Sequence, residues 1–188
     1  MTLVHQSNSR FPANVDQVLR GAGWYPGRAL SNSELEPWLA LKPAQAYGYQ
    51  KIHPAALRVL REFDGLHVQQ DAPGVTRYRE SFHMNPLEFW FTEGDWIRYE
   101  WLIEDTLFPI GVEGPELDEV LAITPRGTVY SMFPIKVGIG FLGETFDQAL
   151  INLIEGYGSK EVEVPDYKTK AEEYRWVRDA VRRLYLSE

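Results

Sequence analysis

The sequence contains no cysteine, and this absence removes several classes of protein at once. Disulfide bridges, thiol nucleophiles and thiolate metal sites are excluded, and the composition is typical of a cytosolic protein. No run of about 18 apolar residues is available to cross a bilayer. Residues 1–6 also lack the basic and apolar regions of a signal peptide. We therefore expect a soluble, cytoplasmic protein.

Positive charge is scarce as well. The chain has 19 Lys and Arg residues against 27 Asp and Glu residues, which gives a net charge of −8. A chain with this charge repels phosphate groups, so neither nucleic acid nor a membrane is expected as a direct partner. A basic protein is a compatible partner, because opposite charges attract each other during association.

Histidine, the commonest metal ligand besides cysteine, is also rare. The four histidines are His5, His53, His67 and His83, and no two of them have the helical spacing of a metal-binding pair. We therefore expect no bound metal.

The length and composition of the sequence are those of an ordinary globular protein. The chain has 188 residues, of which 44% are hydrophobic and 13% aromatic. This length and composition support one domain with a sizeable core and argue against disorder. We expect residues 1–188 to form a single domain.

Hydrophobic spacing predicts helices first and strands afterwards. Apolar residues at helical spacing predict helices over about 12–22, from Ser33 onward, and over 54–63. Strands are then expected at 66–68 and 77–84, followed by an aromatic run at 87–92. A helix is expected over 95–105 and a loop over 107–111.

The remaining sequence predicts a hairpin and two more helices. Two β-rich runs, 120–123 and 128–133, flank a turn that contains proline and glycine. A strand at 137–142, a helix capped by Thr145, a loop at 158–166 and a terminal helix over 169–186 follow. Helices that enclose a series of strands joined by short turns predict an α+β fold, with a mainly antiparallel sheet flanked by N-terminal and C-terminal helices.

A glycine pattern at 138–143, Gly-Ile-Gly-Phe-Leu-Gly, has the spacing of a dinucleotide-binding loop. Glu161 and Glu163 even follow at about the distance expected of a ribose ligand. Too few residues follow Gly143, however, to complete a parallel doubly wound sheet, and the preceding strands form hairpins. We therefore expect a strand thinned or bulged by glycine, and no cofactor.

Evidence for catalytic residues is weak. The sequence has neither a nucleophile elbow nor a phosphate-binding loop. Glu100 and Glu104 lie one helical turn apart, and such carboxylates could serve acid–base catalysis, although they more commonly face solvent. We expect no catalytic residue, and an enzyme that uses carboxylates stays open as a minor alternative.

The negative charge is concentrated in residues 93–119. This segment contains nine acidic residues and one basic residue, Arg98, so it accounts for the whole net charge. Aromatic residues lie in or beside it, and acidic charge with aromatic anchors suits a surface that binds a basic partner. A solvated acidic helix with core aromatics would give the same pattern. The predicted partner-binding residues are Trp90, Glu93, Asp95, Trp96, Glu100, Trp101, Glu104, Asp105, Glu113, Glu116, Asp118 and Glu119.

Several short phrases, in their order and spacing, resemble the SUKH superfamily of bacterial immunity proteins, and specifically its third subfamily. They include Ala-Gly-Trp-Tyr-Pro-Gly-Arg at 22–28, His-Pro-Ala-Ala at 53–56 and Leu-Arg-Glu-Phe-Asp-Gly-Leu-His-Val at 60–68. Similar phrases continue, so that the resemblance covers about residues 14–157. Asp64, Asn85 and Val112 depart from the subfamily pattern, all at expected turns, so they concern loop geometry and toxin choice rather than the fold.

The resemblance implies an α+β fold of helices packed on a mainly antiparallel sheet. It also implies a non-catalytic immunity protein that neutralises a polymorphic or contact-dependent toxin, commonly a nuclease, by direct binding. The basic cleft of a nuclease would suit an acidic partner. A regulatory or scaffolding module that binds a cellular protein is the alternative. Residues 158–188 are expected to be a helical extension outside the resemblance, and the oligomeric state stays open.

Overall fold

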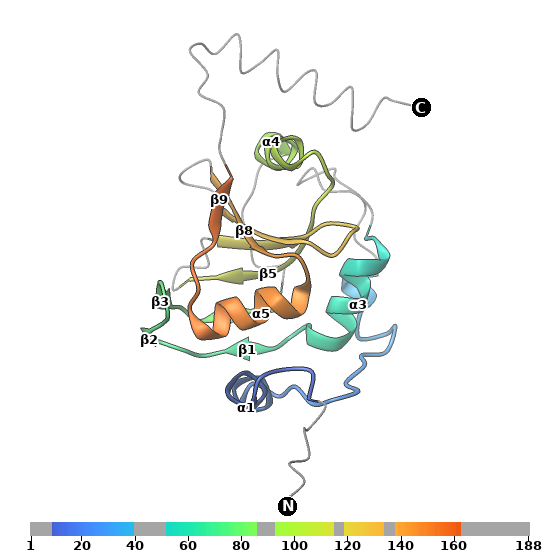
Figure 1. The fold of residues 1–188 in the computed structure, drawn as a ribbon. Helices are drawn as coiled ribbons and strands as arrows, with labels where there is room; N and C mark the ends of the chain where they lie inside the picture. Colours follow the sequence, from blue (N-terminus) through green and yellow to red (C-terminus); the bar gives the residue numbers. More distant parts are fainter. Residues whose placement is uncertain (1–8, 40–51, 86–92, 115–118, 134–137, 163–188) are drawn as a thin grey trace, which may run out of the picture.

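The computed structural model describes residues 9–39, 52–85, 93–114, 119–133 and 138–162, and it confirms the expected α+β architecture (Figure 1). Helices and a largely antiparallel sheet alternate in the expected order. The helices of the described residues are α1 (Ala13–Gly21), α2 (Glu36–Leu39), α3 (Pro54–Phe63), α4 (Glu93–Ile103) and α5 (Phe146–Glu155).

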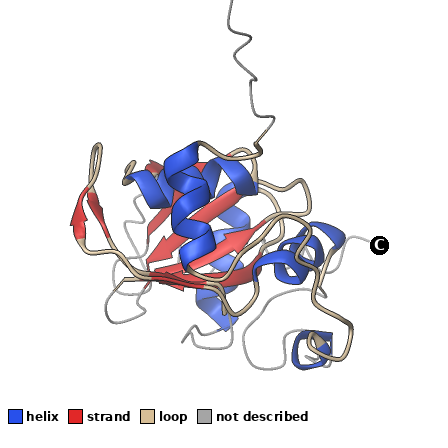
Figure 2. Cartoon of the chain, turned by 90° about the horizontal axis from the view of Figure 1, so that it is seen from below, coloured by secondary structure: helices blue, strands red, loops and turns tan. Residues whose placement is uncertain are grey.

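Seven of the described strands form one sheet in the order β1-β4-β5-β6-β7-β8-β9, and every neighbouring pair is antiparallel. Its strands are β1 (His67–Val68), β4 (Phe82–His83), β5 (Phe108–Glu113), β6 (Glu119–Ile123), β7 (Val129–Phe133), β8 (Gly138–Gly143) and β9 (Lys160–Val162). Strands β2 (Ala72–Pro73) and β3 (Tyr78–Arg79) pair separately. They form a small hairpin at one end of the main sheet (Figure 2).

Helix α3, the β6–β7 hairpin and the start of α5 lie where local sequence signals predicted them. The bounds of α3 are those expected from its apolar spacing, and the expected hairpin is β6 paired with β7. Thr145 caps α5 as predicted, because its hydroxyl accepts a hydrogen bond from the backbone N–H of Gln148 at 3.2 Å. The helix expected from Ser33 is only the single turn α2.

The prediction of a loop at 107–111 is wrong, because residues 108–111 form the first part of strand β5. Pro109 and Gly111 suggested a loop, yet the pairing of β5 with β6 shifts register between them. Such a bulge accommodates a proline inside a sheet. Gly111 is required by close packing, since a Cβ there would collide with the carbonyl oxygen of His83 on β4.

The loop expected at 158–166 contains strand β9, which pairs with β8. Its sequence, Lys-Glu-Val, is short and charged, as protected edge strands often are, so it carries little periodic signal. The aromatic run at 87–92 and the terminal helix predicted over 169–186 lie outside the described residues.

The glycine pattern at 138–143 forms strand β8, which lies between β7 and β9. This confirms the prediction that these glycines belong to a strand. Gly140 lies against Ser159, whose Cβ would be 2.6 Å from an added Cβ. An added Cβ at Gly143 would lie 2.8 Å from the backbone nitrogen of Ala149 on α5. The glycines therefore serve close packing of a strand in an antiparallel sheet.

Both faces of the central sheet are covered. Val120 and Leu121 are neighbours on β6, so they point to opposite faces, and each is only 1% exposed. Helix α5 crosses one face, with α3 beside it and α1 near β1 at the sheet edge (Figure 1). Among the described residues, no helix combines the length and apolar character needed to cross a bilayer.

Candidate protein-binding site

The aromatic and acidic side chains of α4 are divided between core and surface. Trp96 is fully buried, and so is the carboxylate of Glu100. That carboxylate accepts hydrogen bonds from the Trp96 indole Nε1 at 3.1 Å and from the backbone N–H of Leu107 at 2.8 Å. Glu100 therefore joins the end of α4 to the segment that leads into β5, and it is an internal acceptor.

Glu113 is also fully buried, at the end of β5. Its carboxylate forms an ion pair with Arg77, which follows β2 in the small hairpin. Burial raises the pKa of Glu113 to about 7, against the opposing effect of Arg77. Glu119 lies directly opposite Glu113 in the β5–β6 register and accepts a hydrogen bond from the Ser131 hydroxyl at 2.6 Å.

The expectation that Trp96, Glu100 and Glu113 belong to an exposed acidic surface is therefore wrong. Charge counts along a sequence do not separate a solvated carboxylate from one that satisfies buried donors. The other predicted residues have different positions. Glu104 is exposed, Trp101, Asp105 and Glu119 are partly buried, Glu93 and Asp95 belong to α4, and Trp90, Glu116 and Asp118 lie outside the described residues.

Glu104 ends α4 in a conformation that is unusual for its residue type. Its φ is +52°, the left-handed conformation that glycine commonly supplies at the end of a helix. A side chain in this conformation costs about 1 kcal/mol. Among the described residues, the Glu104 carboxylate has no hydrogen bond or ion pair that would offset this strain. The strained residue presents a free negative charge to solvent.

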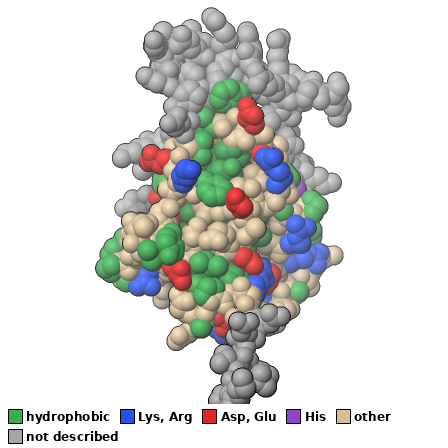
Figure 3. Space-filling model, viewed as in Figure 1, with side chains coloured by type: hydrophobic (Ala, Val, Ile, Leu, Met, Phe, Trp, Pro, Cys, Tyr) green, Lys and Arg blue, Asp and Glu red, His purple; other side chains and the backbone are tan. Residues whose placement is uncertain are grey.

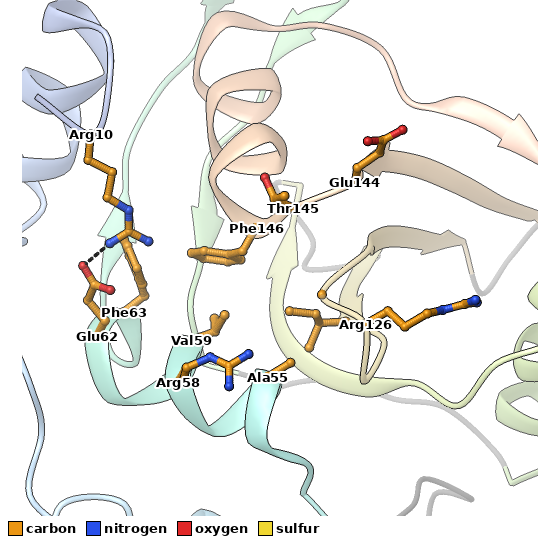
Figure 4. A pocket seen from close by; sticks show the side chains of 12 residues that line it. Arg10, Ala55, Arg58, Val59, Glu62, Phe63, Arg126, Glu144, Thr145 and Phe146 are labelled. Carbon is orange, nitrogen blue, oxygen red and sulfur yellow. Dashed lines mark hydrogen bonds and ion pairs between the residues drawn. The ribbon is translucent and has the colours of Figure 1, made fainter. Parts of the chain in front are cut away.

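Asp105, the residue after Glu104, forms an ion pair with a residue that lines a pocket. Its carboxylate is 2.9 Å from the Arg126 guanidinium, and Arg126 belongs to the turn between β6 and β7 that borders the pocket. The pocket has a volume of about 310 Å³ and lies between α3, the start of α5 and this turn (Figure 4). Its apolar lining consists of Ala55, Val59, Phe63, Ile123 and Phe146.

Three arginines line the pocket, and two of them are neutralised. Arg10 is held by Asp147 at 2.5 Å and by Glu62 at 2.6 Å, and these carboxylates keep the pKa of Arg10 above its usual range. Arg126 is paired with Asp105. Arg58, exposed on α3, makes no hydrogen bond or ion pair with any described residue. We call this cavity the Arg58 pocket.

The acidic pair of Glu104 and Asp105 is joined to the Arg58 pocket by the ion pair between Asp105 and Arg126, because Arg126 lines the pocket. The face that carries α5 has acidic and basic side chains interspersed, without a continuous field of one sign (Figure 3). Glu104 and Asp105, which we call the acidic corner, and the Arg58 pocket thus carry charges of both signs and are linked by the ion pair between Asp105 and Arg126.

Comparison with protein-family models gives one match, to the SUKH-3 immunity protein family, over residues 11–156. The match covers most of the chain and includes the helices and strands that form the Arg58 pocket. The chain belongs to the SUKH-3 immunity protein family. Searches of the curated proteins and of the solved structures found no match.

SUKH-3 membership confirms the resemblance that the sequence phrases indicated, and it implies a role in toxin immunity. The family is generally non-catalytic. The described residues contain no cluster of three or more His, Asp or Glu side chains arranged to hold a metal ion. The surface offers charged groups, hydrogen-bonding groups and an apolar floor.

Sequence reasoning did not find the Arg58 pocket in this SUKH-3 chain, because its walls come from four distant segments. Arg10, α3, the β6–β7 turn and the start of α5 meet only in the folded chain. Local signals did mark the two helix starts that border it, at His53-Pro54 and at Thr145. No signal within one segment indicated that they would meet.

His53 fixes the position of α3 behind this surface. Its Nδ1 accepts a hydrogen bond from the Ala56 backbone N–H at 3.2 Å, and its Nε2 donates to the Ile123 carbonyl at 3.1 Å. The imidazole is therefore neutral with its proton on Nε2, and burial lowers its pKa. Protonation would remove the acceptor that caps the helix.

We predict that acid weakens the fold through His53. Because the folded-state pKa lies below the ordinary value of 6.5, this contribution is complete above that pH and is lost as the pH falls through the lowered pKa. His53→Asn keeps a capping acceptor that does not titrate, so urea unfolding should depend less on pH between 7 and 5. His53→Ala should cost about 1–2 kcal/mol at pH 7. An unchanged pH slope in His53→Asn would contradict the assignment.

Proposed function

We propose that this SUKH-3 protein neutralises a bacterial toxin by binding it directly, without a chemical step. We further propose that the toxin is a basic nuclease domain of a polymorphic or contact-dependent system, met in the cytoplasm. The observation that carries the proposal is the exposed, strained Glu104, which has no partner among the described residues and precedes Asp105, whose ion-pair partner Arg126 lines a pocket. A residue held in a strained conformation without an internal partner is a candidate for an external one.

Charge supports the choice of partner. The chain carries a net charge of −8, and the segment 93–119 contains nine of its acidic residues. The buried carboxylates of this segment also add to its negative potential, except where Arg77 or a bound proton neutralises their charge. Nuclease clefts bind phosphate and are therefore basic, and an acidic protein is attracted to such a cleft over a distance of about 8 Å at physiological salt. Binding across the cleft would exclude the nucleic acid substrate.

The first test is co-expression with the C-terminal domain of a toxin encoded beside this gene. We expect rescue of growth and a complex that co-purifies at one-to-one stoichiometry. Neither rescue nor a complex would contradict the proposal. A co-purified cellular protein without rescue of growth would instead favour the scaffolding alternative.

The second test concerns Glu104 itself. We predict that Glu104→Lys slows association with the toxin about 5-fold to 10-fold at low salt, because charge changes at an interface act mainly on the association rate. The matched control is Glu161→Lys on strand β9, an exposed residue whose substitution changes the net charge equally. Stopped-flow measurements at 50 and 500 mM salt should show the difference only at low salt.

Glu104→Gly separates stability from binding at the same position. Glycine relieves the left-handed strain, so unfolding free energy should rise by up to about 1 kcal/mol while association slows. Equal association rates for Glu104→Lys and Glu161→Lys would remove Glu104 from the proposed interface.

A further inference from the structure

We propose that the Arg58 pocket receives a segment of the toxin in which a carboxylate lies next to an apolar side chain. The carboxylate pairs with Arg58, and the apolar side chain occupies the floor beside Val59 and Phe146. This inference rests on the proposed function and specifies the chemistry of the partner at one point of contact.

The floor of the pocket exposes the edges of two core side chains. Phe146 and Val59 are 9% and 7% exposed, the highest values among the buried hydrophobic residues that the structure describes. Their exposed edges belong to α5 and α3, whose first residues flank the cavity (Figure 4). An apolar side chain that covers them would remove the remaining water from these side chains, which favours binding.

Charge complementarity indicates that the toxin segment in the pocket carries a carboxylate beside its apolar side chain. Arg10 and Arg126 already have carboxylate partners, so the unpaired positive charge at the pocket is that of Arg58. A carboxylate that reaches Arg58 forms a charge-assisted hydrogen bond without breaking an existing one. Glu62 is occupied by Arg10 and by the Trp24 indole Nε1 at 3.0 Å. Glu144 lies across the pocket from Arg58 (Figure 4).

The pocket walls are held in place before any partner arrives. The guanidinium of Arg10 bridges Glu62 on α3 and Asp147 on α5, so it ties together the two helices that form the cavity. His53 fixes the start of α3, and Thr145 caps the start of α5. A site that is ordered in advance loses less conformational freedom on binding.

The mixed charge also explains selectivity. The corner of Glu104 and Asp105 attracts basic surfaces in general, and many nucleases have them. Arg58 adds a requirement for an acidic group at a fixed distance from those basic groups, and a cation at that point would be repelled. Recognition therefore combines an attractive element with a repulsive one, as specific interfaces commonly do.

The test uses the full chain and the toxin domain encoded beside its gene, with affinity measured by calorimetry. We expect Arg58→Glu to weaken binding about 30-fold or more, because a fully paired interfacial charge is reversed. Arg58→Lys keeps the charge but loses the planar fork, so it should be intermediate. The control is Arg61→Glu, on the same helix but outside the pocket; Arg61 donates a surface hydrogen bond to Asn32, and we expect less than about a 3-fold change in affinity. Circular dichroism verifies that all variants fold.

A charge exchange then identifies the partner group. Cross-linking mass spectrometry of the complex locates the toxin carboxylates near α3, and a carboxylate-to-lysine variant should restore binding to Arg58→Glu. Wild-type affinity in Arg58→Glu would overturn the pocket inference and leave the proposed function standing. A change of oligomeric state in Arg58→Glu, with toxin binding unchanged, would assign the pocket to self-association and overturn the inference as well. Failure of the wild-type chain to bind the toxin domain would overturn both.

Discussion

Replacing Arg77 with alanine is expected to lower the free energy of unfolding by about 3–5 kcal/mol at pH 8. Arg77 is the ion-pair partner of Glu113, whose side chain is completely buried. One carboxylate oxygen of Glu113, Oε2, already lacks a hydrogen-bond partner. Without Arg77 the buried carboxyl group would have to stay ionised with no compensating charge or take up a proton at a pH above its pKa, and either outcome costs free energy.

The loss should depend on pH in a defined direction. Burial raises the pKa of Glu113 from 4.5 to about 7, and the nearby carboxylates of Glu119 and Glu80 raise it further. Because the folded state binds this proton more tightly than the unfolded state, its contribution to stability is complete below about pH 4.5 and is lost as the pH rises through 7. The Arg77→Ala penalty should therefore shrink at pH 5.5, where Glu113 takes up a proton.

Urea unfolding at pH 5.5 and pH 8 measures both effects. Glu113→Gln resembles the protonated carboxyl, so the double variant Arg77→Ala/Glu113→Gln should recover much of the stability lost at pH 8. The difference between the single and double variants isolates the coupling of the two side chains. An equal loss at both pH values, or no recovery in the double variant, would show that ionisation of Glu113 does not control the stability of this hairpin contact.

Substitution of Gly156 by alanine is expected to cost about 2–4 kcal/mol. Gly156 ends α5 with φ +73°, so any side chain there adds left-handed strain of about 1 kcal/mol. An added Cβ would also lie 2.6 Å from the Gly74 Cα and 2.7 Å from the Arg79 Cγ. Gly74 and Arg79 belong to the small hairpin, which must move to accommodate it, and overpacking of this kind costs about 1–3 kcal/mol.

Gly65→Ala is the matched control for this prediction. Gly65 has nearly the same φ, +77°, but an added Cβ would meet no atom within 4 Å. It should therefore lose only about 1 kcal/mol, from backbone strain alone. Calorimetric melting of the two variants separates strain from collision. Equal losses would show that the hairpin does not press on the end of α5.

These two predictions concern the same structural unit. The backbone N–H groups of Val75, Thr76 and Arg77 donate to the carbonyls of Glu155 and Gly156, and the Arg77 guanidinium also donates to the Tyr157 carbonyl at 3.1 Å. The hairpin of β2 and β3 is thus held against the end of α5 by backbone bonds, glycine contact and a buried ion pair. Disturbing either the charge or the close approach should release it.

Local patterns were sufficient for several elements of this fold. Pro54 at the start of α3 and Thr145 before α5 are capping and starting signals that act within one turn of helix. The β6–β7 hairpin follows from two β-rich runs and a four-residue turn, in which Gly127 has a φ of +97°. Interactions this local depend little on the rest of the chain.

Strand β5 shows where local patterns stop being reliable. Pro109 and Gly111 are typical loop residues, and the residues around them were accordingly predicted as a loop. All six residues of β5 are buried in the structure, where β6 pairs with the strand along its length and β4 pairs with Val112 and Glu113 on the other edge. A partner strand on each side outweighs the propensity of two residues.

Composition alone established the lack of thiol chemistry and the net negative charge, and the order of periodic segments was enough for an α+β fold. These properties are sums or short-range patterns, so they can be obtained from the linear chain. Which carboxylates are exposed was decided by packing: Glu100 and Glu113 are buried, whereas Glu104 faces solvent. The unpaired charge of Arg58 above an apolar floor likewise arises only where four distant segments meet. Burial and charge compensation depend on neighbours in space, and folding determines those neighbours.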